Sequence, residues 1–204
     1  MCCKKLNYWP EDITLLGEHV KIEPLTEKHL SDLQDAVRDG ELHLLWYTLI
    51  PHANDMLVEI NRRLALRESG SMQPFAVIDR ARDLVIGMTT FMNIDASNKR
   101  VEIGSTWLSK STQRKSFNTE CKLLLMTHAF EELGCIAVEF RTHIENIQSR
   151  NAIERLGAKF DGILRNHSVM PNGTLRDTVV YSVIKSEWTR VKSHLKFLLN
   201  KKRD

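Results

Sequence analysis

The chain has 204 residues, of which 42% are apolar and 27% charged, with a formal net charge of +3. These values predict one sizeable core in a single domain spanning residues 1–204. The small, scattered positive charge argues against nucleic-acid binding, and no apolar run approaches the roughly 18 residues of a membrane span. The first residues lack the apolar segment of a secretory signal, so we expect a cytoplasmic protein.

The first part of the chain predicts one strand and two helices. Residues 14–23 alternate apolar and polar side chains after Gly17, as in a strand with one wet face. A helix follows from Thr26, its candidate N-cap, to Gly40, which would end it. A second helix with an apolar stripe is predicted over residues 54–68.

The middle of the chain predicts an antiparallel meander, a loop and a long helix. Three strand-like runs, at residues 74–79, 84–94 and 100–108, are separated by short polar turns. A polar loop at 109–116 leads into a helix predicted over 118–133. The junction of loop and helix is where chemistry is expected.

The last part predicts a strand, a helix, two strands joined by a tight turn, and a final helix, at residues 136–142, 146–156, 158–169, 177–184 and from 186 onward. The order before the final helix is one strand, two helices, three strands, helix, strand, helix and two strands. Such an order predicts a mixed α/β sandwich (α+β mixed) rather than a regular doubly wound sheet.

The four cysteines predict neither a metal site nor a nucleophile. Cys2, Cys3, Cys121 and Cys135 show no zinc-ligand spacing with one another or with histidine. Cys2 and Cys3 are free thiols or, as the less common alternative, an acylation site. Cys121 lies one turn inside a predicted helix among apolar residues, so packing is its expected role.

The junction after residue 108 has the features of an anion site. Unpaired backbone N–H groups and the helix dipole meet where a loop enters a helix. In the segment Q-R-K-S-F-N-T-E-C, Gln113, Arg114 and Lys115 add donors and positive charge. On spacing alone, the same string also fits a basic loop in which Asn118 or Thr119 is an ordinary helix cap.

Six stretches in a fixed order carry a family resemblance: Glu102–Leu108 (E-I-G-S-T-W-L), Gln113–Glu120 (Q-R-K-S-F-N-T-E), His128–Gly134, Asn146–Ala158, Gly162–His167 and Arg176–Val183. Over residues 15–188 the chain resembles the RimJ/RimL-like branch of the GNAT superfamily of acetyltransferases. The resemblance implies a GNAT-like acyl-CoA N-acyltransferase fold, with a central, mostly antiparallel mixed sheet flanked by helices. A short N-terminal extension and a C-terminal helix would flank this core.

The resemblance implies acetyl-CoA as the acetyl donor, with its pyrophosphate held at the start of the helix. The loop residues implied are Gln113, Arg114, Lys115, Ser116, Phe117, Asn118 and Thr119. The pantetheine would run beside the strand that ends at Trp107 and Leu108, which splays from its neighbour in similar proteins. Leu108 N–H is then the candidate oxyanion donor. Similar proteins usually have glycine where this chain has Ser116, which adds a Cβ near the phosphate.

Transfer to an amine requires a base and a stabilised thiolate. Glu102 is the candidate base, and a surface carboxylate paired with a lysine or arginine is its alternative role. Asn146 would cap its helix and, like its family counterpart, bond to pantetheine. Ser149 is the candidate leaving-group stabiliser, or else an exposed helix serine. Glu120 would repel a phosphate unless it faces solvent, which we expect.

The resemblance implies direct acetyl transfer, without an acyl-enzyme, to an amine of a small molecule or a protein N-terminus, and the sequence does not choose between these acceptors. The alternative is a catalytically weak or inactive coenzyme A-binding regulatory protein of the same fold, which Ser116 favours. His128 is expected to be a packed or half-exposed side chain rather than a base. Tyr181 is expected to lie in the core, with the role of an acid, which tyrosine has in similar proteins, as its alternative. The resemblance also allows a homodimer.

Overall fold

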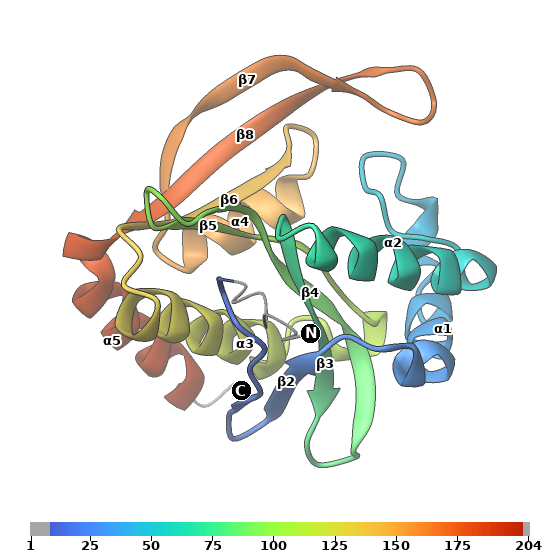
Figure 1. Cartoon of the computed structure of the whole chain (residues 1–204), viewed down its shortest axis with the longest axis horizontal. Coiled ribbons are helices and arrows are strands. Elements are labelled where there is room, and N and C mark those ends of the chain that lie inside the picture. The colour runs from blue at the N-terminus through green and yellow to red at the C-terminus, as the bar shows by residue number, and fades with distance from the viewer. Residues whose placement is uncertain (1–8, 202–204) are drawn as a thin grey trace, which may run out of the picture.

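The computed structural model describes residues 9–201, and their strands form one sheet in the order β1-β2-β3-β4-β5-β6-β8-β7 (Figure 1). The strands are β1 (Leu15–Leu16), β2 (Val20–Pro24), β3 (Met72–Asp79), β4 (Leu84–Asp95), β5 (Arg100–Leu108), β6 (Ala137–His143), β7 (Lys159–Val169) and β8 (Leu175–Ile184). Among the strands of residues 9–201, only β5 and β6 pair in parallel, and the other pairs are antiparallel. The predicted mixed α/β architecture, with a mostly antiparallel sheet, is confirmed.

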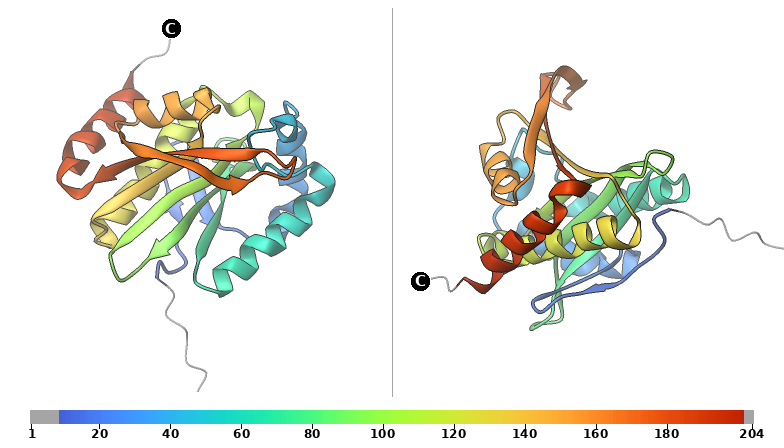
Figure 2. Two further views of the ribbon diagram at one scale, coloured as in Figure 1. Left: turned by 90° about the horizontal axis from the view of Figure 1, so that it is seen from above. Right: turned by 90° about the vertical axis from the view of Figure 1, so that its left-hand side faces the viewer.

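Helices cover both faces of the sheet. They are α1 (Leu30–Arg38), α2 (Met56–Glu68), α3 (Ser116–Thr127), α4 (Ile147–Arg155) and α5 (Trp188–Asn200). One apolar cluster joins α3, α4 and α5 to the sheet, and a second joins α1 and α2 to it. The β7–β8 hairpin extends beyond the rest of the sheet (Figure 2). No helix within residues 9–201 has both the length and the apolarity needed to cross a membrane.

Strand β3 shows why the sheet needs helices on both sides. Its side chains alternate between the two clusters, with Phe75 and Val77 in the first and Ala76 and Ile78 in the second. Successive side chains of a strand point to opposite faces, so a strand buried on both faces has a continuous apolar run. The run at residues 74–79 is such a strand.

The N-terminal strand prediction is wrong in one respect: residues 14–23 form a tight hairpin of two strands. Leu15 pairs with Ile22, and Gly17 N–H donates to the Val20 carbonyl at 2.8 Å. The turn closes around Glu120 of α3, and a Cβ on Gly17 would lie 2.5 Å from the carboxyl carbon of that residue. A side chain at residue 17 would therefore have to displace the Glu120 carboxylate, which is consistent with glycine at this turn.

Glu120 is buried rather than facing solvent, which corrects the sequence-based expectation. Its carboxylate accepts backbone N–H bonds from Glu18, His19 and Val20 at 2.7, 2.8 and 2.8 Å. Charge-assisted bonds of this kind satisfy a buried carboxylate. Glu120 therefore fastens α3 to the β1–β2 turn.

The helix boundaries agree with the predictions to within a few residues. Thr26 caps a 3₁₀ turn, Glu27–His29, that runs directly into α1. α3 begins at Ser116 rather than at 118, with Lys115 as its N-cap, so neither Asn118 nor Thr119 is the cap. A single π-helical turn, His128–Glu132, extends α3.

The residues expected to pack in the core are buried. Cys121 is fully buried, and burial raises the pKa of its thiol to about 11, which fits packing rather than reactivity. His128 and Tyr181 are buried as well. Cys2 and Cys3 lie outside the described residues.

Candidate active site

The parallel strands β5 and β6 diverge, and a cavity opens between them. Their pairing ends at Glu102 and Glu139, although β5 continues to Leu108 and β6 to His143. A cavity of about 750 Å³ lies at this opening, lined by residues of α2, α3, α4, β5, β6 and β8. The last six residues of β5 therefore have β4 on one side and the cavity on the other.

The backbone of Leu108 faces this opening. Ser109 N–H donates to the Ile86 carbonyl at 2.8 Å, which makes the adjacent Gly87–Leu108 pair a non-hydrogen-bonded one. The N–H and C=O of Leu108 consequently point away from β4. Gln113 Nε2 donates to that carbonyl at 2.9 Å. The Leu108 N–H is thus directed at the cavity, as expected of an oxyanion donor.

A β-bulge in β5 lies beside this amide. Between Gly104 and Trp107, β5 has one residue more than β4, and Ser105 takes a left-handed conformation with φ 46°. The buried Arg63 of α2 donates to the Ser105 carbonyl at 3.3 Å, to Thr90 Oγ1 at 2.8 Å and to Glu59 at 2.6 Å. Arg63 therefore links α2 to the bulge of β5, a contact between segments that are far apart in the sequence.

The start of α3 is an uncapped helix N-terminus at the cavity. The N-cap, Lys115, makes no side-chain cap bond, and the first N–H groups of any helix have no intrahelical acceptor. Arg114 is left-handed, with φ 59°, between two extended residues, Gln113 and Lys115, so the chain turns sharply just before α3. Arg114, Lys115 and Asn118 line the cavity. The backbone here can accept an anion such as a phosphate.

Ser116 does not occupy a position that requires glycine for its conformation. It is the first residue of α3, and the left-handed residue of this loop is Arg114. The difference from the family pattern at Ser116 is therefore one of side-chain volume and not of backbone freedom.

The other predicted cofactor residues divide into two groups. Those that line the cavity are Trp107, Leu108, Gln113, Arg114, Lys115, Asn118, Asn146 and Ser149. Asn146 is the N-cap of α4, and its Oδ1 accepts the Ser149 N–H at 3.0 Å, which confirms the predicted cap. Ser116, Phe117 and Thr119 are not part of the lining. Phe117 packs against the core, and the hydroxyl of Thr119 accepts a bond from Arg155 at 3.1 Å.

Glu102, the candidate base, lies in the cavity wall and is only 4% exposed, so the alternative role of a surface carboxylate does not apply. Asn93 Nδ2 donates to it at 2.6 Å, and Arg141 Nε lies 3.4 Å away. Burial nevertheless raises the pKa of Glu102 above its ordinary value. A carboxylate with a raised pKa is a better proton acceptor, which suits a general base.

His143 also faces the cavity and was missed in the sequence. Its Nδ1 accepts the Glu145 N–H at 3.1 Å, so Nε2 carries the proton. That buried Nε2 has no hydrogen-bond partner within residues 9–201. The rings of Trp46 and Tyr47 lie 5.2 and 6.4 Å from it between centroids. Its position depends on the divergence of β6 from β5, which no local pattern reveals.

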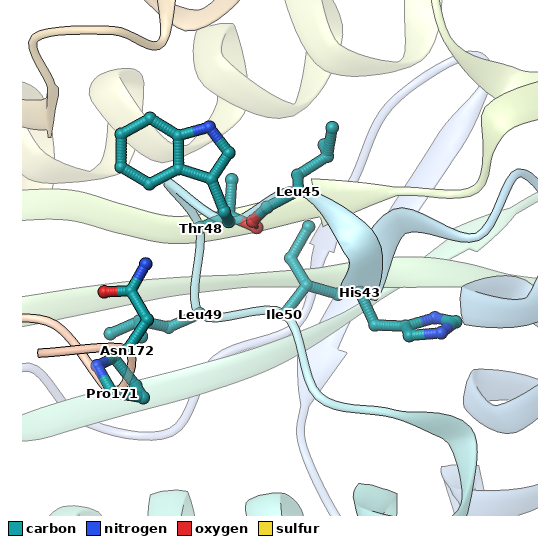
Figure 3. A pocket seen from close by; sticks show the side chains of 8 residues that line it. His43, Leu45, Thr48, Leu49, Ile50, Pro171 and Asn172 are labelled. Atoms are coloured by element: carbon teal, nitrogen blue, oxygen red, sulfur yellow. Dashed lines mark hydrogen bonds between the residues drawn. The ribbon is translucent and has the colours of Figure 1, made fainter. Parts of the chain in front are cut away.

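The mouth of the cavity is apolar and joins a smaller hollow of about 380 Å³. Two segments far apart in the sequence line the hollow (Figure 3), with the residues His43, Leu45, Trp46, Thr48, Leu49, Ile50, Pro171 and Asn172. Leu45, Thr48, Leu49 and Ile50 line the larger cavity as well. Trp46 and Leu49 are 52% and 63% exposed. This end of the site is open to a large molecule.

Known proteins share this architecture. Residues 19–159 match the family described as Acetyltransferase (GNAT) domain. The Bacillus subtilis protein named "Putative ribosomal N-acetyltransferase YdaF" is 36% identical over 179 residues, which are 85% of this chain and 95% of that protein. A crystal structure of a GCN5-related N-acetyltransferase from Brucella melitensis is 35% identical, with a TM-score of 0.84 over 93% of this chain and 86% of that one.

A more distant structure shares the fold alone. Mycobacterium smegmatis RimJ in complex with CoA-disulfide has a TM-score of 0.76 at 17% identity, and the match covers 93% of this chain and 95% of that one.

Proposed function

The chain belongs to the GNAT family of acetyltransferases, and from that premise we propose that its cavity receives acetyl-CoA at one end and an amine at the other. It is an N-acetyltransferase, and acetyl-CoA is its acetyl donor. The observation that carries the site assignment is the divergence of β5 from β6 beside the uncapped start of α3.

The donor would be held mainly by backbone. The pyrophosphate binds the amides at the start of α3, where the helix dipole favours negative charge. The pantetheine runs along the open edge of β5 and bonds to Asn146, and the thioester carbonyl accepts the Leu108 N–H. Ser149 lies at the cavity, where its hydroxyl can donate to the departing sulfur.

The acceptor amine would approach Glu102. Alkyl ammonium ions must lose a proton before they attack a thioester, and Glu102 takes that proton directly or through a water. The amine nitrogen then forms a C–N bond as the C–S bond breaks, without an acyl-enzyme. The Nε2–H of His143 is a donor that can orient a carbonyl group of the acceptor.

We assign the acceptor as the N-terminal amine of a protein. The name of the Bacillus subtilis relative points to a ribosomal protein. The wide apolar mouth, with the exposed Trp46 and Leu49, fits a peptide chain better than an enclosed small molecule.

A thiol-release assay tests the acceptor. We expect peptides with a free N-terminus to release coenzyme A, whereas the same peptides with a blocked N-terminus and an internal lysine should not. Faster release with polyamines than with any peptide would contradict the assignment.

Thermal unfolding tests the donor site, because a ligand that binds the folded state raises its stability. Both acetyl-CoA and coenzyme A should raise the melting temperature, and a Lys115→Ala variant should show a smaller rise. No shift with either ligand would refute the donor site. A shift without thiol release for any amine would instead support a regulatory coenzyme A-binding protein.

A further inference from the structure

A buried lysine of α3 faces the donor end of the cavity. Lys122 lies one helical turn after Asn118, and both residues line the cavity. Only 5% of Lys122 is exposed. Its Nζ donates to Thr106 Oγ1 at 2.6 Å and to Thr89 Oγ1 at 3.4 Å. The ammonium group is therefore held against the face of β4 and β5 that α3 covers.

This cation has hydroxyl partners but no counter-ion. No carboxylate within residues 9–201 forms an ion pair with it. The neighbouring Cys121 thiol stays neutral because burial raises its pKa to about 11. Burial of a charge is costly unless the charge is paired. Burial lowers the pKa of Lys122 to about 8, so the charged form of this lysine still predominates at neutral pH.

The position of Lys122 relates it to the reacting end of the donor. Thr106, its closest partner, is two residues before Leu108 on the same strand, so the side chains of these two residues point to the same face of the sheet. Leu108 N–H faces the opening at which we place the thioester. The Lys122 ammonium beside residues 106–108, with no carboxylate paired to it within residues 9–201, can stabilise an anion that forms there during the reaction.

We propose that the ammonium of Lys122 stabilises the coenzyme A thiolate as it leaves; this inference rests on the proposed function. The amine nitrogen bonds to the carbonyl carbon, and the electron pair of the C–S bond departs with the sulfur. The proton of the amine passes to Glu102. Lys122 keeps its own protons and pairs with the thiolate, which solvent protonates on release. Ser149 adds a neutral hydrogen bond to the same sulfur.

Kinetics of Lys122→Met give the first test, because methionine keeps the length of the side chain and removes its charge. We expect kcat to fall about tenfold to a hundredfold, while KM for acetyl-CoA changes by less than about threefold. Lys122→Arg, which keeps the charge, should recover part of the loss. Lys196→Met, which removes the charge of an exposed lysine of α5 outside the cavity, is the matched control and should leave kcat within about twofold.

The ionisation of bound coenzyme A gives a second test that a merely structural lysine would not affect. At pH 8 the ultraviolet absorbance of the thiolate should show a thiolate-to-thiol ratio about tenfold higher in the wild-type complex than in the Lys122→Met complex. Binding of desulfo-coenzyme A, which lacks the thiol, should be equal in both and shows that the variant is folded. Equal ratios would overturn this inference alone, whereas a wild-type protein that binds neither ligand would overturn the proposed function with it.

Discussion

The two ends of the cavity are built from different parts of the chain. At the donor end, the divergent edge of β5 and the first turn of α3 present backbone N–H groups, and the side chains nearby hold that backbone in place. At the mouth, the surface consists of side chains from the 43–50 loop and the β7–β8 turn. Donor binding should therefore tolerate many substitutions, whereas acceptor selection should follow individual side chains.

Two buried charged residues of α3, Glu120 and Lys122, also differ in the partners that satisfy their charges. Glu120 is buried with three backbone donors, so its charge is satisfied inside the protein. Lys122 is buried with two hydroxyl groups and no carboxylate within the described part of the chain. A fully satisfied buried charge indicates a structural role, and an incompletely satisfied charge at a cavity indicates a ligand.

The largest effect is expected where the two ends meet. Glu102→Gln keeps the shape of the side chain and its contact with Asn93 but cannot accept a proton, so kcat should fall about a hundredfold or more. Affinity for acetyl-CoA should change little. An unchanged kcat in steady-state kinetics would remove Glu102 from the mechanism.

The pH profile sharpens that prediction. Because burial raises the pKa of Glu102, the active carboxylate is lost as the pH falls through this raised pKa. kcat/KM should therefore rise with pH across that range in the wild type, and this rise should be absent in Glu102→Gln.

The next largest effect is expected on stability, when Glu120, which fastens α3 to the β1–β2 turn, is replaced. Glu120→Ala leaves three backbone N–H groups without their acceptor, and we expect a loss of about 3 kcal/mol in the free energy of unfolding, measured with urea. Glu120→Gln keeps one acceptor oxygen and should lose less. Equal stability of Glu120→Ala and the wild type would show that the hairpin does not hold the donor end.

Substitution at the mouth should affect the acceptor alone. Leu49→Ala removes an exposed apolar contact, so KM for a peptide acceptor should rise about threefold to tenfold, with acetyl-CoA affinity unchanged. Leu44→Ala is the matched control, since Leu44 is similarly exposed, at 65%, but lines neither cavity. Equal effects of the two variants would contradict a specific acceptor surface.

The smallest effect is expected at Ser116. Because its backbone is helical and needs no glycine, Ser116→Gly should change the acetyl-CoA dissociation constant by less than about threefold in calorimetry. A gain of tenfold or more would show that the serine Cβ obstructs the phosphate.

Local patterns were sufficient for much of the fold. The meander at residues 74–108, the cap at Asn146 and the basic loop before α3 follow from alternation, capping chemistry and turn residues. Each depends on residues close together in the chain, so each is visible without a structure.

Only the tertiary structure revealed the rest, because the deciding contacts join distant residues. A side chain at residue 17 would displace the carboxylate of Glu120, which lies more than a hundred residues later in the chain. Glu102 and His143 share a cavity because β5 and β6 diverge. The charge of Lys122 is informative only because no carboxylate within residues 9–201 pairs with it. Sequence determined the elements and the family; the packing of distant segments decided which charged groups face the cavity.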